Sequence, residues 1–386
     1  MQAPAGSMVM AKVGERIRQS MKTHRHLYDE IISDKNIELA IKEACKSRKK
    51  SNKKRAKLDR LKLRPDRVDI VRGWIENYKE MRRIPHEIYD GIARKKRNIY
   101  VPSVRETVVQ HAVVQILNQH LMTGIYEHTY AAIKGRGQHK AKKYIEKYIR
   151  EHSRGVKYYL KMDIKQYFPS VPQDRLIAKL KREVKDTRTV ELVKKILYAS
   201  EDGIPLGYFI SQWFANYYLR DMDHRIKQMV GGDMYVRWMD DMVIFSGNKR
   251  DLHRYKDEIS GMLEGLGLRL KDNWRIQRFD HPKGGCFLDY MGFRFYRNRT
   301  TMRRSIMYRI TRKARKIAKK DKPTIYEIKQ FMSYVGWLSH SDTYGIYTER
   351  VKPYVDIQYM KRRISRYDKR RARDDISDST RQRETA

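Results

Sequence analysis

The chain has 386 residues, and its charge is strongly unbalanced: 86 Lys and Arg stand against 46 Asp and Glu, a formal net charge of +40. An excess of this size is typical of proteins that bind a polyanion, and nucleic acid is the first candidate. No run approaches the roughly 18 consecutive apolar residues of a membrane-spanning helix, and no signal peptide precedes the chain. The composition therefore argues against a membrane or secreted protein.

Two cysteines, Cys45 and Cys286, are too few and too far apart for a disulfide framework or a zinc site. They predict a reducing compartment, so we expect a cytoplasmic protein. The opening MQAPAGSM resembles a leader or a cloning remnant, with Met8 or Met10 as alternative native starts.

The N-terminal part has apolar residues near helical spacing at 28 to 46 and at 67 to 81. We therefore expect helices between residues 20 and 90, interrupted by the basic run KSRKKSNKKRAK (46 to 57), and a further helix over 104 to 122. The basic run and a second one, KRRISRYDKRRAR (361 to 373), fit either phosphate contacts or disordered segments.

Two strand-like segments of the central region end in acids. YYLKMDIKQYFPSV (158 to 171) contains Asp163, and YVRWMDDMVIF (235 to 245) carries Asp240 and Asp241 between apolar stretches. A buried hairpin does not normally hold two carboxylates unless a cation compensates for their desolvation. Three carboxylates on neighbouring strands make a site for two Mg²⁺ ions, about 3.5 to 4 Å apart, that catalyse phosphoryl transfer. The implied reaction is nucleotidyl transfer.

Each acid also has an ordinary structural interpretation. An Asp-Asp pair is common in hairpin turns, and Asp163 alone would suit the N-cap of a following helix. The order and spacing of several motifs together favour the active-site interpretation.

Six blocks in a fixed order carry a resemblance that covers residues 95 to 345. They are RNIYVPSVRETVVQHAV (97 to 113), YAAIKGRGQHKA (130 to 141), DIKQYF (163 to 168), GIPLGYFISQWFANYYL (203 to 219), WMDD (238 to 241) and FLDYMGFRF (287 to 295). On these blocks the chain resembles the bacterial reverse transcriptases, a lineage that includes group II intron enzymes, retrons, diversity-generating retroelements and antiphage-defence enzymes. The resemblance implies an RNA-directed DNA polymerase, encoded by a bacterium or a phage, that uses Mg²⁺ or alternatively Mn²⁺.

The fold implied by the resemblance is α+β, a right-hand polymerase with fingers, an antiparallel-sheet palm and a helical thumb. The pattern agrees, because helices are expected at 173 to 183, 188 to 199, 208 to 229 and 249 to 266 beside the acid-bearing strands. We predict a leader over 1 to 19, N-terminal helices and fingers over 20 to 157, a palm over 158 to 300, a thumb over 301 to 370 and a basic, polar tail over 371 to 386.

The resemblance also assigns the metal site. Asp163 and Asp240 would bind both ions, the carbonyl of Ile164 would complete one coordination shell, and Asp241 would support the primer end. Trp238 stands where the family usually has Tyr. The hydrogen bond of that hydroxyl would be lost, while the large ring could still support the primer.

The incoming nucleotide is assigned to residues of the fingers and palm blocks. Arg97 and Arg105 stand where the family places basic residues on the triphosphate. Phe168 resembles the aromatic steric gate that excludes a ribose 2′-hydroxyl, with core packing as the alternative. Primer contacts are assigned to three residues of the last block, Tyr290, Met291 and Gly292.

The block at 203 to 219 departs from the common family pattern. Leu206 replaces the Gln whose amide would contact the nucleotide, Gly207 would let backbone approach it, and Gln212 completes the predicted nucleotide-binding set. An aliphatic residue at the position of Leu206 resembles the signature of diversity-generating retroelement enzymes, where it accompanies error-prone copying of template adenines. Some defence-associated enzymes share this pattern.

The general acid for the pyrophosphate leaving group stays open. Trp274 occupies the position where the family would place a Lys, and Lys271 and Arg275 on either side are the alternatives.

Three functions follow as hypotheses. The first is an error-prone reverse transcriptase of a diversity-generating retroelement, with an RNA template, a DNA or RNA primer and a small accessory protein. The second is a defence-associated enzyme that works with a structured noncoding RNA. The third is a non-catalytic RNA-binding protein on a polymerase scaffold, which three clustered acids in a basic protein disfavour.

Overall fold

The computed structural model describes residues 23–46, 53–90, 95–152, 155–279 and 286–384. The predicted leader and part of the first basic run lie outside the described residues. Two compact units divide the chain: the first holds residues 1–137, 160–245 and 249–276, and the second holds 138–159, 246–248 and 277–386. The domain boundaries predicted from the sequence stay predictions, and the one placed at residue 370 falls inside a continuous helix, Ile357–Glu384.

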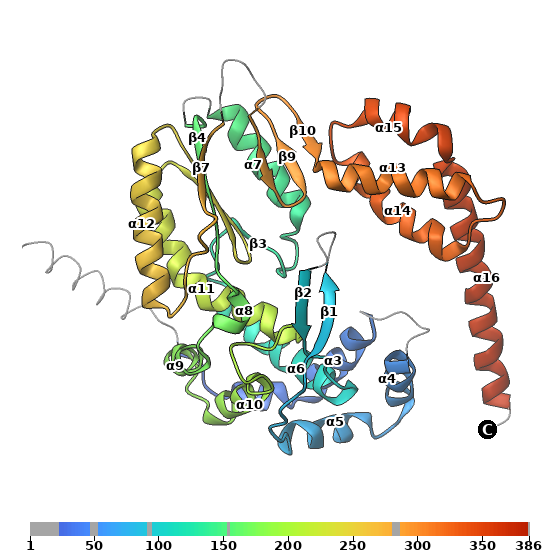
Figure 1. The fold of residues 1–386 in the computed structure, drawn as a ribbon. Helices are drawn as coiled ribbons and strands as arrows, with labels where there is room; N and C mark the ends of the chain where they lie inside the picture. The colour runs from blue at the N-terminus through green and yellow to red at the C-terminus, as the bar shows by residue number, and fades with distance from the viewer. Residues whose placement is uncertain (1–22, 47–52, 91–94, 153–154, 280–285, 385–386) are drawn as a thin grey trace, which may run out of the picture. The chain divides into compact units, whose positions relative to one another are not determined.

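The N-terminal part of the first unit is helical apart from one hairpin (Figure 1). Its elements are α2 (Leu27–Ile31), α3 (Asp34–Lys46), α4 (Lys53–Leu63), α5 (Arg67–Glu76), β1 (His86–Asp90), β2 (Lys95–Ile99) and α6 (Val104–Leu121). Helix α6 begins with a capping box in which Ser103 accepts from the backbone of Glu106, and it packs against α3, α5 and α11.

The prediction of helices up to residue 90 is wrong after α5. Strands β1 and β2 form an antiparallel hairpin from the His86↔Ile99 pair to the Asp90↔Lys95 pair. Both faces of β1 lie in solvent, since Ile88 is 39% and Tyr89 66% exposed. A strand with no buried face shows no alternation of apolar and polar residues, so the sequence carried no strand signal.

The central sheet has the strand order β3-β5-β6-β4-β7. Its strands are β3 (Thr129–Tyr130), β4 (Tyr158–Asp163), β5 (Met234–Trp238), β6 (Asp241–Ser246) and β7 (Arg275–Arg278). Strands β5 and β6 form the predicted antiparallel hairpin. Strand β3 pairs parallel with β5, so the sheet is mixed and the prediction of a purely antiparallel sheet is corrected.

The helices of this region agree with the sequence prediction to within two residues. They are α9 (Gln173–Glu183), α10 (Thr187–Leu197), α11 (Phe209–Val230) and α12 (Lys249–Gly265), and a short helix for which no bounds were predicted, α8 (Tyr167–Ser170), precedes them. Helix α11 contacts β5, α6 and α12, and it buries Ile210, Phe214 and Tyr217 completely. A sheet with helices packed against it confirms the α+β fold class.

The second unit combines a small sheet with helices. Its elements are α7 (Gln138–Glu151), β8 (Leu288–Tyr290), β9 (Phe293–Phe295), β10 (Thr300–Met302), α13 (Arg304–Ala318), α14 (Ile325–Ser339), α15 (Tyr344–Arg350), η1 (Lys352–Tyr354) and α16 (Ile357–Glu384). Helices α13 and α14 bury an apolar cluster that includes Ile310, Ile328 and Phe331. The expected helical segment after residue 305 is therefore present. No helix among the described residues has the length and apolarity needed to cross a bilayer.

Candidate active site

The hairpin of β5 and β6 presents two of the predicted catalytic acids. Trp238 pairs with Asp241, which leaves Met239 and Asp240 as a two-residue turn. Met239 has a positive φ of 57°, the backbone conformation that type I′ and II′ hairpin turns require at their first central residue. Asp240 therefore lies in the turn itself, and Asp241 is the first residue of β6.

The third acid, Asp163, is linked to this turn by a backbone hydrogen bond of the next residue. Asp163 is the last residue of β4, and the amide of the next residue, Ile164, donates to the carbonyl of Asp240 at 3.2 Å. The alternative role of Asp163 as a helix cap is not observed, because Gln166 is the N-cap residue of α8. The structure thus brings Asp163, Asp240 and Asp241 together at one edge of the sheet.

The segment after α12 closes this edge from the other side. Ile164 forms an antiparallel bridge with Leu270, flanked by bonds from Lys165 N to Arg269 O and from Lys271 N to Asp163 O, both 2.9 Å. Neither bond uses the Ile164 carbonyl, which agrees with its predicted role as a metal ligand. Carboxylate and carbonyl oxygens are the hard ligands that Mg²⁺ prefers, so the donor set fits a divalent cation. Among the described residues, however, no three acidic, His or Cys side chains converge closely enough to hold one.

Two of the predicted catalytic acids, Asp163 and Asp241, each have a lysine nearby. Lys271 Nζ lies 3.8 Å from Asp163 Oδ2, and Lys161 Nζ lies 3.9 Å from Asp241 Oδ1. These pairs are long and about one third exposed, so each stabilises the fold only modestly. Of the residues considered for the general acid, Lys271 is the one in contact with a catalytic carboxylate. Trp274 contacts Lys256 and His253 of α12 instead.

A fully buried ion pair links the β5–β6 hairpin to helix α11, and the sequence prediction missed it. Arg237 of β5 and Asp223 of α11 are both 0% exposed and form a bidentate pair, with Nε to Oδ1 at 2.7 Å and Nη2 to Oδ2 at 2.6 Å. Asp223 also accepts from the Tyr235 hydroxyl at 2.7 Å and from Thr129 Oγ1 at 3.1 Å. The carboxylate therefore has four donors and no contact with water.

The remaining donors of Arg237 connect this pair to the turn. Its Nη1 donates to the carbonyl of Met239 at 2.8 Å and to Asn216 Oδ1 at 3.2 Å. Asn216 Nδ2 in turn donates to the carbonyl of Ala131 at 3.0 Å. One guanidinium thus fixes the residue before Asp240, helix α11 and the loop after β3. The available signal was a charged residue inside an apolar strand, which is rarely buried unless paired.

The Arg237 guanidinium keeps its charge in the folded protein. Burial by itself would lower the pKa of the Arg237 guanidinium, but the Asp223 carboxylate raises that pKa above its ordinary value. Removing one partner of a buried, hydrogen-bonded pair leaves the other charge without compensation, which destabilises proteins far more than loss of an exposed pair does.

The predicted triphosphate ligands lie in different surroundings. Arg97 is an exposed residue of β2. Arg105 of α6 donates to the backbone carbonyls of Trp74 at 3.1 Å and Asn77 at 2.7 Å, so its guanidinium anchors the end of α5 in this structure. Both triphosphate assignments stay predictions, and that of Arg105 requires its guanidinium to leave these carbonyls.

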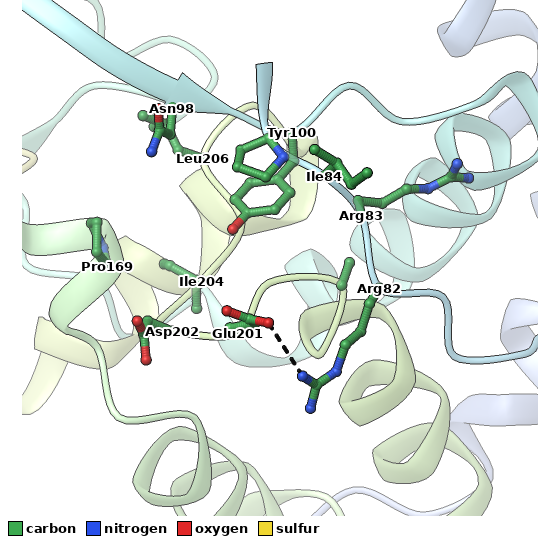
Figure 2. Close-up of a pocket in the computed structure, with 12 residues that line it drawn as sticks. Arg82, Arg83, Ile84, Asn98, Tyr100, Pro169, Glu201, Asp202, Ile204 and Leu206 are labelled. Atoms are coloured by element: carbon green, nitrogen blue, oxygen red, sulfur yellow. Dashed lines mark hydrogen bonds and ion pairs between the residues drawn. The ribbon is translucent and has the colours of Figure 1, made fainter. Parts of the chain in front are cut away.

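A cavity of about 450 Å³ lies beside Leu206 (Figure 2). The Tyr100 ring projects into it, with the hydroxyl directed toward the side where Ile204 and Glu201 lie. Burial and the nearby acids Glu201 and Asp202 raise the pKa of Tyr100, so this hydroxyl stays protonated. The Tyr100 amide donates to the Leu206 carbonyl at 2.7 Å. The cavity therefore joins the predicted nucleotide position at Leu206 to Tyr100, the residue that follows β2.

Position 207 requires glycine, because its backbone lies close to that of Tyr100. Gly207 has a φ of 106°, and a Cβ there would lie 2.5 Å from the Tyr100 carbonyl. Phe168, the predicted steric gate, is half-buried, and its carbonyl accepts from the Ile204 amide at 2.9 Å. Gln212 does not share this cavity but lines a separate one, so the predicted nucleotide-binding residues do not form one cluster.

The predicted primer contacts divide between the two units. Trp238 lies half-buried beside the acids of the first unit. In the second unit, Met291 and Gly292 form the turn between β8 and β9 with φ of 50° and 84°, as a type I′ turn requires. Tyr290 is fully buried, so it supports this hairpin from within. Their contact with a primer stays a prediction.

Part of the chain is similar to known proteins. Residues 85–273 match the family described as reverse transcriptase (RNA-dependent DNA polymerase). The chain is 24% identical to the retron Ec73 reverse transcriptase of Escherichia coli over 217 residues, 51% of this chain and 65% of that protein. It is 30% identical over 168 residues to an uncharacterized 91 kDa protein in the cob intron of Schizosaccharomyces pombe, 40% of this chain and 19% of that protein.

Two further proteins are similar to this chain at lower sequence identity. Protein YkfC of E. coli K12 is 22% identical over 250 residues, 53% of this chain and 65% of that protein. The structure of telomerase from Candida albicans with a fragment of telomeric RNA aligns with 74% of this chain and 59% of that chain, at 13% identity and a TM-score of 0.46. The chain thus spans less than two thirds of the relatives that it matches.

The mixed sheet, the acid-bearing hairpin and the helices packed against the sheet are consistent with the α+β fold of a right-hand polymerase. Residues 85–273 form a reverse transcriptase domain, and the predicted resemblance to the bacterial reverse transcriptases and the α+β fold class are confirmed.

The structural role of the buried pair of Arg237 and Asp223 can be tested by measuring the stability of a variant. We expect Asp223→Asn to lower the free energy of unfolding by about 3 to 5 kcal/mol, because it leaves the Arg237 charge buried and uncompensated. The matched control is Asp66→Asn, which breaks an exposed bidentate pair with Arg64 of nearly the same geometry, 2.8 and 2.7 Å, and should destabilise the protein far less. Urea unfolding measures both, and equal losses would contradict the assigned role of the pair.

Proposed function

We propose that this protein copies RNA into DNA, using a primer strand and deoxynucleoside triphosphates. The observation that carries the proposal is the backbone link between Ile164 and Asp240, which brings the acids of two blocks to one edge of a reverse transcriptase domain. A protein that uses this fold only as an RNA-binding scaffold has no requirement for three acids there. The strong positive charge supports binding of the template and primer.

In the proposed mechanism, Asp163, Asp240 and Asp241 hold two divalent ions, Mg²⁺ or Mn²⁺, together with the Ile164 carbonyl. Two such ions would activate the primer 3′-oxygen and stabilise the leaving pyrophosphate. Without ions, the carboxylates repel one another and Lys271 and Lys161 provide partial compensation. Lys271 lies beside Asp163, and we assign to it the role of proton donor to the leaving group. Phe168 would restrict the sugar to deoxyribose.

The biological setting has two candidates. Similarity to a retron reverse transcriptase favours an enzyme that works with a structured noncoding RNA in defence. The aliphatic Leu206 favours an error-prone enzyme of a diversity-generating retroelement with an accessory protein. Leu206 borders the cavity of Figure 2, which supports a role of its side chain in nucleotide selection under either hypothesis. A cytoplasmic location stays a prediction.

The catalytic assignment predicts a loss of synthesis without a loss of binding. Asp163→Asn and Asp240→Asn should each lower primer extension on an RNA template by at least about a thousandfold, because each removes a metal ligand. The affinity for the template-primer duplex should stay within about twofold, since phosphate contacts come from Lys and Arg. The control is Asp272→Ala, an exposed acid next to Lys271, which should extend normally. An Asp240→Asn variant with wild-type extension would contradict the site.

The Leu206 side chain predicts low fidelity. A position without a hydrogen-bonding amide loses part of the penalty, about 1 to 3 kcal/mol per unsatisfied group, that separates correct from incorrect geometry. Leu206→Gln should therefore lower misincorporation, most clearly opposite template adenine, whereas Leu206→Met keeps an apolar side chain and should not. Sequencing of DNA copied from a defined RNA measures the error rate. Accurate copying by the wild type would contradict the retroelement hypothesis and favour the defence role.

A further inference from the structure

A second cavity of the first unit, about 440 Å³, lies among α3, α6 and the N-terminal end of α11. Two aromatic residues of α11, Phe209 and Trp213, form one wall. Phe209 stacks on His111 of α6 with ring centroids 4.5 Å apart and planes inclined by 24°. Phe209 is nevertheless 44% exposed, so one aromatic surface is fixed in orientation and still accessible.

Gln115 of α6 lines the same cavity and lacks hydrogen-bond partners. Its Oε1 and Nε2 are both out of contact with solvent, and neither has a partner among the described residues. An unpaired buried amide destabilises a protein, and such groups are rare in native structures unless water or a ligand satisfies them. To contact a ligand in the cavity, this amide would have to turn toward it by rotation about the side-chain torsions.

The neighbouring polar residues already have structural roles. Gln110 Oε1 accepts from the amides of Phe209 at 2.9 Å and Ile210 at 3.4 Å, which holds the start of α11. Asn118 Oδ1 accepts from the Trp213 indole at 3.3 Å, which fixes that ring. Gln115 is therefore the member of this face whose amide oxygen and nitrogen both lack a partner in the structure.

The ionic groups at the cavity suit a phosphate-bearing ligand. Lys46 and Lys134 are exposed and line the cavity, and Glu43, paired with Lys46 at 2.6 Å, is the acid that accompanies them. Lysines beside an aromatic surface are the usual combination in sites for single-stranded nucleic acid, where bases stack and phosphates contact the cations.

We propose that this cavity binds an unpaired nucleobase of a single-stranded nucleic acid, stacked on Phe209 and hydrogen-bonded by the Gln115 amide. A carboxamide offers a donor and an acceptor side by side, and an unpaired base presents both on its Watson–Crick edge. The site lies apart from the three acids and needs no metal. Its test is a binding measurement without synthesis, so its outcome is independent of the proposed polymerase activity.

The experiment compares two labelled strands by fluorescence anisotropy, without primer, nucleotide or metal: a short single-stranded RNA and an abasic ribose-phosphate strand of the same length. Gln115→Leu and Phe209→Ala should each weaken binding of the RNA about tenfold and leave the abasic strand unchanged. The matched control is Gln119→Leu, an exposed glutamine of the same helix that does not line the cavity. Free nucleoside monophosphates serve as competitors.

Each other outcome overturns the proposal. Equal losses for both strands would mean a general electrostatic or structural effect, and unchanged RNA binding would mean that no base enters. Competition by a monophosphate as effective as the RNA strand would indicate a mononucleotide site instead. Thermal unfolding separates a folding role, because Gln115→Leu removes two unsatisfied buried atoms and should unfold at an equal or higher temperature than the wild type. A marked decrease would make Gln115 a structural residue.

Discussion

The buried pair of Arg237 and Asp223 is the interaction on which the geometry of this site depends. A guanidinium and a carboxylate removed from water are tolerated only when nearly all their donors and acceptors are satisfied. Asp223 accepts further hydrogen bonds from the hydroxyls of Tyr235 and Thr129. Arg237 donates further hydrogen bonds to Asn216 and to the Met239 carbonyl. Because bidentate geometry is specific, the pair fixes β5 relative to α11 and leaves the turn with Asp240 little freedom.

The catalytic edge has the opposite character. Its acids lie on a hairpin turn and a strand end, half exposed, with lysines near 4 Å. Such loose pairs can rearrange when a cation arrives, whereas the buried pair below cannot. A rigid support under an adaptable set of carboxylates is the arrangement that preorganised catalysis requires. The two cavities that border Leu206 and Gln115 are lined by other parts of the same unit.

The sequence predicted the elements that have strong local signals. Helices α9, α10 and α12 have marked apolar periodicity, and the segments around Asp163 and Asp240 stand out by acids next to apolar runs. It missed the β1–β2 hairpin, which has no buried face, and two features that depend on partners distant in sequence: the parallel pairing of β3 and the network of Arg237. The amide of Gln115 that lacks hydrogen-bond partners could not be predicted either, because a glutamine within a helix has no sequence signal until its surroundings are known.

The most direct test is the single-turnover rate of nucleotide addition by Asp223→Asn on an RNA template, measured against Mg²⁺ concentration at a temperature where the variant is folded. If the pair positions the catalytic turn, the maximal rate should fall at least about tenfold, a loss of about 1.4 kcal/mol in transition-state stabilisation, with duplex affinity unchanged. Saturating Mg²⁺ should not restore it, and Asp66→Asn should match the wild type. A wild-type maximal rate in a measurably destabilised Asp223→Asn protein would contradict the account.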